Sequence, residues 1–149
     1  MREIAFHFIV AYLATAAFGI VFYAPVKTLP FSAITGAFGY ITYYLILKYV
    51  DAGDVLACAA GGVVIAFLSE IFAMVQKNPV TAYEMPAIMP LVPGIGLYRT
   101  MITFMQNDSV GAVDYLFQTI LSAASIAIGL ILTEAVTQAW LRRKVKKYK

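Results

Sequence analysis

Five long apolar segments, separated by short polar connections, follow one another along the chain. Each is about as long as the roughly 20 residues that an α-helix needs to cross the hydrocarbon core of a bilayer. The apolar runs are continuous, whereas strands of a membrane β-barrel alternate over about ten residues. The pattern therefore predicts an all-α integral membrane protein with about five transmembrane helices. We expect these helices over Ile4–Ala24, Phe31–Tyr49, Val55–Val75, about Ala82–Gln106 and Val113–Ala139.

The fourth segment is predicted to be a broken helix. It carries three prolines and two glycines within eleven residues, namely Pro86, Pro90, Pro93, Gly94 and Gly96. A proline has no N–H, so the carbonyl four residues earlier loses its helical donor. Unpaired backbone at membrane depth is tolerated only inside protein or facing a water-filled cavity. We therefore expect an unwound middle in which Pro90, Pro93 and Gly94 line a substrate site; a proline kink without function is the alternative.

Two carboxylates lie inside apolar segments, Glu70 in the third and Glu134 in the last. A carboxylate in a membrane span is costly and usually faces a cavity or a partner. If both lie at a similar depth, they predict a shared site for a coupling ion or proton. Glu70 has the alternative of reaching the headgroups, and Glu134 that of an ion pair with Arg142 or Arg143.

Arg99 follows the predicted break by a few residues. A guanidinium group binds carboxylates through paired, charge-assisted hydrogen bonds. Arg99 is therefore a candidate for binding a substrate carboxylate, although a long cationic side chain can also reach outward to the headgroups.

Small residues recur at spacings that place them on one helix face. They allow neighbouring membrane helices to approach closely. These positions are Ala11, Thr15 and Gly19 in the first segment, Ser32, Gly36 and Gly39 in the second, Gly61 and Gly62 in the third, and Ser122, Ser125, Gly129 and Thr133 in the last.

The charges of the connections predict an orientation. With five spans and a cytoplasmic C-terminus, Lys27 and Lys77 fall inside, while Asp54 and Asp108 fall outside. This agrees with the enrichment of Lys and Arg in cytoplasmic loops. A re-entrant fourth segment would leave four spans and reverse these positions. We therefore predict an N-terminus outside and a C-terminus inside.

Composition agrees with a membrane protein and excludes several classes of function. Hydrophobic residues make up 62% of the 149 residues and charged residues 13%, with a mean hydropathy of +0.81; soluble domains carry about 45–50% and about 25%. One histidine and one cysteine leave no metal-binding cluster and no intramolecular disulfide. No combination of residues predicts an enzyme, and no cofactor is expected.

Six of the eleven Lys and Arg residues lie in 142–149. Directly after an apolar helix, such a tail indicates a cytoplasmic anchor rather than a nucleic-acid partner. We expect a single transmembrane domain over 1–149 with a basic cytoplasmic tail at 141–149.

One run of residues resembles a known family. It reads Ser69-Glu70, Lys77-Asn-Pro79, Pro86-Ala-Ile-Met-Pro90-Leu-Val-Pro93-Gly94 and Tyr98. It is similar to the C-terminal half of the threonine/serine exporter family, a half that also occurs as a separate short subunit. The resemblance implies a bacterial inner-membrane transporter subunit that exports small carboxylate-bearing metabolites, either threonine and serine or dicarboxylates such as succinate.

The resemblance also implies a partner in the bilayer, either a second membrane subunit similar to the exporter's N-terminal half or further copies of this chain. Two five-span halves joined in one chain would have opposite orientations, as in inverted-repeat transporters. The site would then lie between the halves. A structural, assembly or channel-forming subunit without its own substrate site is the alternative.

Overall fold

The computed structural model describes residues 2–50 and 53–146, and only the backbone of residues 138 and 140–146. In these residues the chain is helical, with short connections. The elements are α1 (Arg2–Val21), α2 (Leu29–Tyr49), α3 (Asp54–Gln76), α4 (Thr81–Ile88), the 3₁₀ turn η1 (Met89–Leu91), α5 (Gly94–Met105) and α6 (Ser109–Lys146). Four helices are long and apolar enough to cross a membrane, and a bent pair of helices adds a fifth span if the two cross as one. The predicted all-α architecture of about five spans is confirmed, while the orientation stays a prediction.

The bent pair, which is fourth along the chain, is the predicted broken helix. Its two parts, Thr81–Leu91 and Gly94–Met105, meet at an angle of 43°. The helix continues through Pro86 and breaks only after η1, where Val92 leaves helical geometry and Pro93 follows. Because the chain bends by 43° and does not double back, α5 leads away from α4 as the second half of a broken span does.

Small residues form the contacts between the helices, as the sequence predicts. The buried residues of α1 are Ala11, Thr15 and Gly19. In α3, a Cβ on Gly62 would lie 2.9 Å from the carbonyl oxygen of Ile126 in α6. Glycine is required where two helix backbones come this close. The absence of a side chain at Gly62 therefore determines which face of α3 packs against α6.

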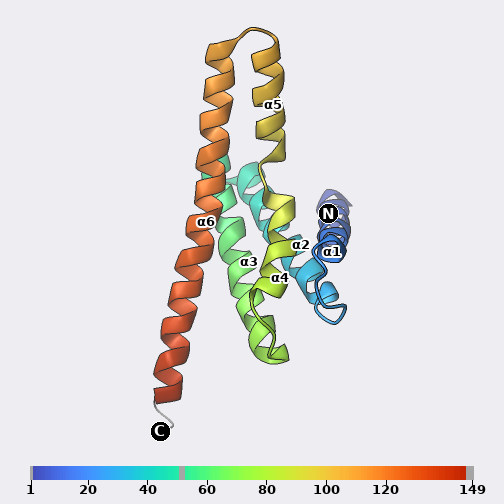
Figure 1. The fold of residues 1–149 in the computed structure, drawn as a ribbon, viewed down its shortest axis with the longest axis vertical. Coiled ribbons are helices and arrows are strands. Elements are labelled where there is room, and N and C mark those ends of the chain that lie inside the picture. Colours follow the sequence, from blue (N-terminus) through green and yellow to red (C-terminus); the bar gives the residue numbers. More distant parts are fainter. Residues whose placement is uncertain (1, 51–52, 147–149) are drawn as a thin grey trace.

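The first third of α6 extends beyond the rest of the bundle. α6 has 38 residues and α3 has 23, which correspond to about 57 Å and about 34 Å at 1.5 Å per residue. Beyond the start of α3, α6 packs against α5, and α5 contacts no other described element. We call residues 94–121 the α5–α6 hairpin; it projects from the upper end of the molecule in Figure 1.

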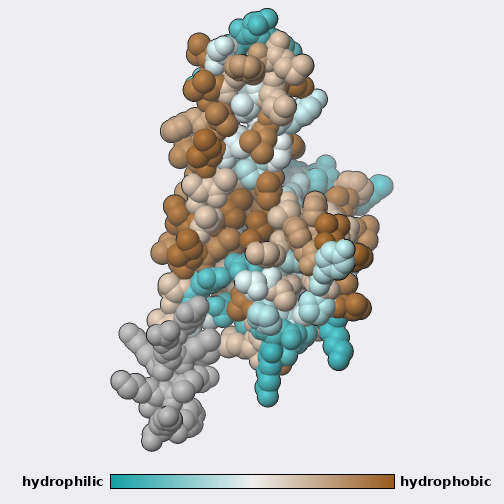
Figure 2. All heavy atoms as spheres, in the orientation of Figure 1, coloured by the Kyte–Doolittle hydropathy of each residue, from teal (hydrophilic) through white to brown (hydrophobic). Residues whose placement is uncertain are grey.

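The α5–α6 hairpin is apolar but exposed. No residue of α5 is buried, and brown, hydrophobic residues cover much of the hairpin in Figure 2. The exposed apolar side chains include Ile95, Leu97, Tyr98, Met101, Phe104, Val113 and Phe117. The predicted helix boundaries do not indicate this projection, because it depends on the offset between α6 and α3 along their axes.

Candidate functional site

Three carboxylates from three helices come together near the inner end of the predicted topology. Glu70 of α3 is 4% exposed and Glu84 of α4 is 7% exposed, while Glu134 of α6 is half-buried. The carboxyl groups of Glu84 and Glu134 interact directly, and Glu70 is close enough to both to interact electrostatically. The structure thus places Glu70 within electrostatic range of Glu134, and it adds a third carboxylate.

Two buried side-chain oxygens in the described part of the chain lack a hydrogen-bond partner. They are Oε1 of Glu84 and Oγ of Ser69, the residue before Glu70. A buried polar atom without a partner costs about 1–3 kcal/mol. Such atoms are informative, because nearly all buried polar groups in folded proteins are paired.

No cation among the described side chains pairs with these carboxylates. The one ion pair among those side chains joins Lys48 to Glu3. The predicted alternative for Glu134, an ion pair with Arg142 or Arg143, lies outside the described side chains. The described residues also contain no group of three His, Cys, Asp or Glu with the geometry of a metal site.

Glu84 was not singled out by the sequence analysis, although the sequence contains a signal for it. Glu70 lies six residues before the end of α3, and Glu84 lies three residues after the start of α4. The connection between the two helices is only four residues long, from 77 to 80. When two neighbouring helices are joined by a short connection, residues that are equally far from the connection lie at a similar depth. The depths of Glu70 and Glu84 therefore differ by about 5 Å.

The predicted substrate residues lie at the break. Pro90 and Pro93 are half-buried and Gly94 is exposed. A Cβ on Gly94 would meet no atom within 4 Å, so its backbone is open to an approaching group. Pro93 follows Glu84 by nine residues, a helical distance of about 14 Å. The break and Glu84 therefore lie at different depths of the same broken span.

Arg99 lies on α5, five residues beyond Gly94, and its side chain is exposed. No ion pair involves it among the described residues. The structure does not join Arg99 to the carboxylates, and the guanidinium group is free to meet a group that approaches the α5–α6 hairpin.

A different polar contact joins three helices at the other end of α3. Asp54 accepts hydrogen bonds from the hydroxyl of Tyr43 in α2 at 2.7 Å and from Oγ of Ser122 in α6 at 2.6 Å. Ser122 is almost fully buried. The Asp54 carboxylate therefore fixes α6 against α2 and α3 at the point where the α5–α6 hairpin begins.

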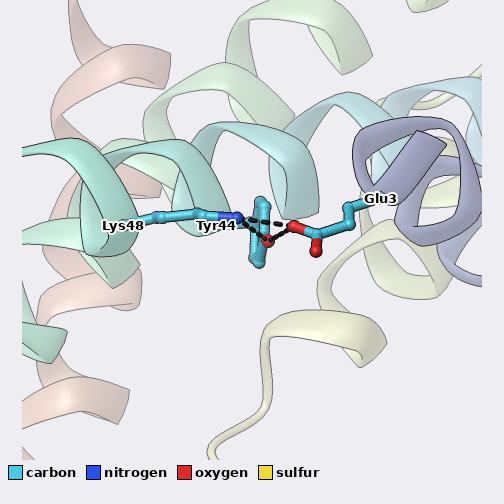
Figure 3. A network of polar contacts seen from close by, with 3 residues as sticks. All are labelled: Glu3, Tyr44 and Lys48. Carbon is cyan, nitrogen blue, oxygen red and sulfur yellow. Dashed lines mark hydrogen bonds and ion pairs between the residues drawn. The ribbon is translucent and has the colours of Figure 1, made fainter. Parts of the chain in front are cut away.

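The N-terminal end carries an exposed ion pair. Nζ of Lys48 donates to Oε2 of Glu3 at 2.6 Å and to the hydroxyl of Tyr44 at 3.0 Å (Figure 3). The ring of His7 lies 4.3 Å from that of Tyr44. Exposed pairs of this kind contribute little to stability. The position of His7 fits an interfacial residue better than a proton relay through the membrane.

Comparison with known proteins identifies the same family that the motif resembles. The family model "Threonine/Serine exporter, ThrE" matches residues 7–136. An uncharacterized protein of Haemophilus influenzae is 29% identical over 89% of this chain and 45% of its own length. A threonine/serine exporter of Corynebacterium glutamicum is 24% identical over 91% of this chain and 26% of its own length.

A probable threonine/serine exporter of Mycobacterium tuberculosis is 25% identical over 75% of this chain and 21% of its own length. This chain thus spans less than half the length of these relatives. No solved structure matches it.

Proposed function

Because the chain belongs to the threonine/serine exporter family, we propose that it is a subunit of a secondary transporter that exports small carboxylate-bearing metabolites. Threonine, serine and dicarboxylates such as succinate are the candidate substrates. The observation that carries this proposal is the broken span, which bends by 43° between Leu91 and Gly94. Discontinuous helices of this kind expose backbone groups to substrates and ions in many transporters.

The substrate site lies at the break. Pro93 interrupts the helix, and Pro90 and Gly94 flank the interruption. The backbone of Gly94 is open to a substrate, since its Cβ would meet no atom within 4 Å. Arg99, exposed on the next helix, attracts the substrate carboxylate. Glu70 and Glu134 hold the coupling ion or proton, supported by the electrostatic interaction between them.

The site is completed by a second membrane subunit or by another copy of this chain. Support comes from the relatives, which are longer than this chain by a factor of about two or more. The exposed apolar side chains of the α5–α6 hairpin agree with a neighbour in the membrane. We propose that the 149 residues act as one transmembrane domain whose partner has the opposite orientation, which places the substrate between the two.

Reconstitution in liposomes tests this proposal. The chain, alone and with its presumed partner, is supplied with radiolabelled serine, threonine or succinate under a proton gradient. Transport only with the partner supports a half-transporter, and transport by the chain alone means that a homo-oligomer completes the site. Absence of transport in both cases contradicts the proposal and favours an assembly subunit, for which the small-residue packing faces are suited.

A further inference from the structure

The three carboxylates form a more specific site than a pair of coupling residues. They come from α3, α4 and α6, so three separate helices direct ionisable groups to one place. Glu70 and Glu84 are both more than nine-tenths buried. Glu84 interacts directly with Glu134 and electrostatically with Glu70. Such a cluster differs from a chance run of acidic residues on one surface. Each of the three helices must be rotated correctly for its carboxylate to interact with the others.

Three ionised carboxylates in such a place would repel one another strongly. The repulsion between like charges grows as water is removed, since the effective dielectric constant falls. Carboxylate pairs in proteins respond by sharing one proton. A proton between Glu84 and Glu134 converts their contact into a short O–H···O hydrogen bond with a charged acceptor, one of the stronger kinds.

An unpaired carboxylate oxygen also points to a bound proton. Oε1 of Glu84 is buried without a hydrogen-bond partner. Protonation of Glu84 adds the donor that such a group lacks. A divalent metal ion is a poorer fit, because the described residues hold no three-ligand group with suitable geometry.

No other described group around this site is a candidate for holding the proton. On α4, the hydroxyl of Tyr83 donates to Gln76 and accepts from Asn78, so it is already engaged. α2 packs against both α3 and α4, and Lys27 of the α1–α2 connection is exposed. Among the described side chains, the titratable groups that act on Glu84 are Glu70 and Glu134.

From this geometry we propose that Glu70, Glu84 and Glu134 form a shared proton-binding site, with Glu84 as the member that carries the proton on the broken span. The role of this proton in transport rests on the proposed function. When Glu84 loses its proton, repulsion from Glu134 displaces Glu84 and, with it, α4. Since α4 continues directly into the break, the same movement displaces Pro93 and Gly94, which couples proton release to the substrate site.

Infrared difference spectroscopy of the purified full chain in nanodiscs tests the site itself. We expect a carbonyl band from a buried protonated carboxyl group at neutral pH, and its loss in Glu84→Gln and in Glu134→Gln. The matched control Glu3→Gln removes an exposed carboxylate that pairs with Lys48 and should keep the band. Size-exclusion chromatography identifies variants that fail to fold, because they lose monodispersity. If Glu84→Gln fails to fold, Glu84→Asp, which keeps a carboxyl group, replaces it. The band of Glu84→Asp should shift but persist.

Two results would overturn the proton site. One is a wild-type spectrum without the band, which means that all three groups are ionised. The other is a band that survives substitution of each of the three glutamates.

The transport assay separates this inference from the proposed function. Glu84→Gln should accumulate no more substrate with a proton gradient than without one, while Glu3→Gln responds as the wild type does. A band without any wild-type transport would refute the transporter and leave the proton site standing. Gradient-driven transport by Glu84→Gln equal to that of the wild type would refute the coupling role of Glu84.

Discussion

Gly62 leaves no room for a side chain at the contact between α3 and α6. We expect Gly62→Ala to destabilise the fold by about 1–3 kcal/mol, the usual cost of overpacking, because its Cβ would lie 2.9 Å from a backbone oxygen that cannot rotate away. The measurement is the apparent midpoint of thermal unfolding in detergent. Gly94→Ala is the control, since its Cβ meets open space. Equal midpoints for the two variants would contradict the packing described here.

Arg99 is the residue at which substrate chemistry can be tested most directly. We expect Arg99→Gln to lower transport of carboxylate substrates by about tenfold or more, since hydrogen bonds to charged groups contribute about 1.5–3 kcal/mol. Transport of the corresponding amides, which lack the carboxylate, should change little. Parallel uptake assays with the acid and the amide provide the measurement.

Lys27→Gln is the matched control for Arg99, because it removes another exposed cation, far along the chain from the break. Equal losses for acid and amide in Arg99→Gln would indicate a structural role for Arg99 instead of carboxylate binding.

At the scale of elements, the hydrogen bond between Ser122 and Asp54 determines where α6 leaves the bundle. Ser122→Ala removes the 2.6 Å contact and leaves one carboxylate oxygen with only the distant Cys58 thiol, at 4.0 Å. We expect faster hydrogen–deuterium exchange in the α5–α6 hairpin, because α6 is then held less firmly at its base. Ser109→Ala, at an exposed position of the same helix, should leave exchange unchanged; similar rates in both variants would show that the contact does not hold α6.

The helices themselves could be predicted from the sequence, because the thickness of a bilayer sets the length of an apolar run. The break could also be predicted, since proline removes a backbone donor wherever it stands. The short connection between α3 and α4 indicates the depth of Glu84, but its interaction with Glu134 could not be predicted, because it depends on the rotation of α4. Helix rotation is set by packing, here by contacts such as Leu91 against Gly61.

The same limit applies to Glu70 and Glu134. Their similar depth was evident from the lengths of the spans, but depth alone does not bring two side chains together. The contact between their helices requires the glycines at Gly62 and Gly129, whose missing Cβ atoms let the backbones approach.

At the scale of the whole molecule, the loop between α3 and α4 and the end of α6 lie toward one end, and the loop between α5 and α6 lies at the other (Figure 1). Lys77 belongs to the first group and Asp108 to the second. The positive-inside rule then places the N-terminus outside and the C-terminus inside.

Reporters fused to each terminus measure this orientation. A phosphatase, active only outside the cytoplasm, should be active at the N-terminus, and a fluorescent protein that matures inside should fluoresce at the C-terminus. The reverse pattern would contradict the predicted orientation. A partner subunit with the same orientation as this chain would exclude the inverted-repeat arrangement.

The α5–α6 hairpin also has a consequence for how the chain is made. α5 contacts only α6 among the described elements, and α6 is the next segment to be synthesised. During translation, therefore, α5 emerges with its apolar side chains and without the helix that packs against it, for a time set by elongation at about 5–20 residues per second. We expect the insertion machinery to retain α5 until α6 follows, so that the two enter the bilayer as a pair, and a chain stopped before α6 to be recognised by membrane proteases.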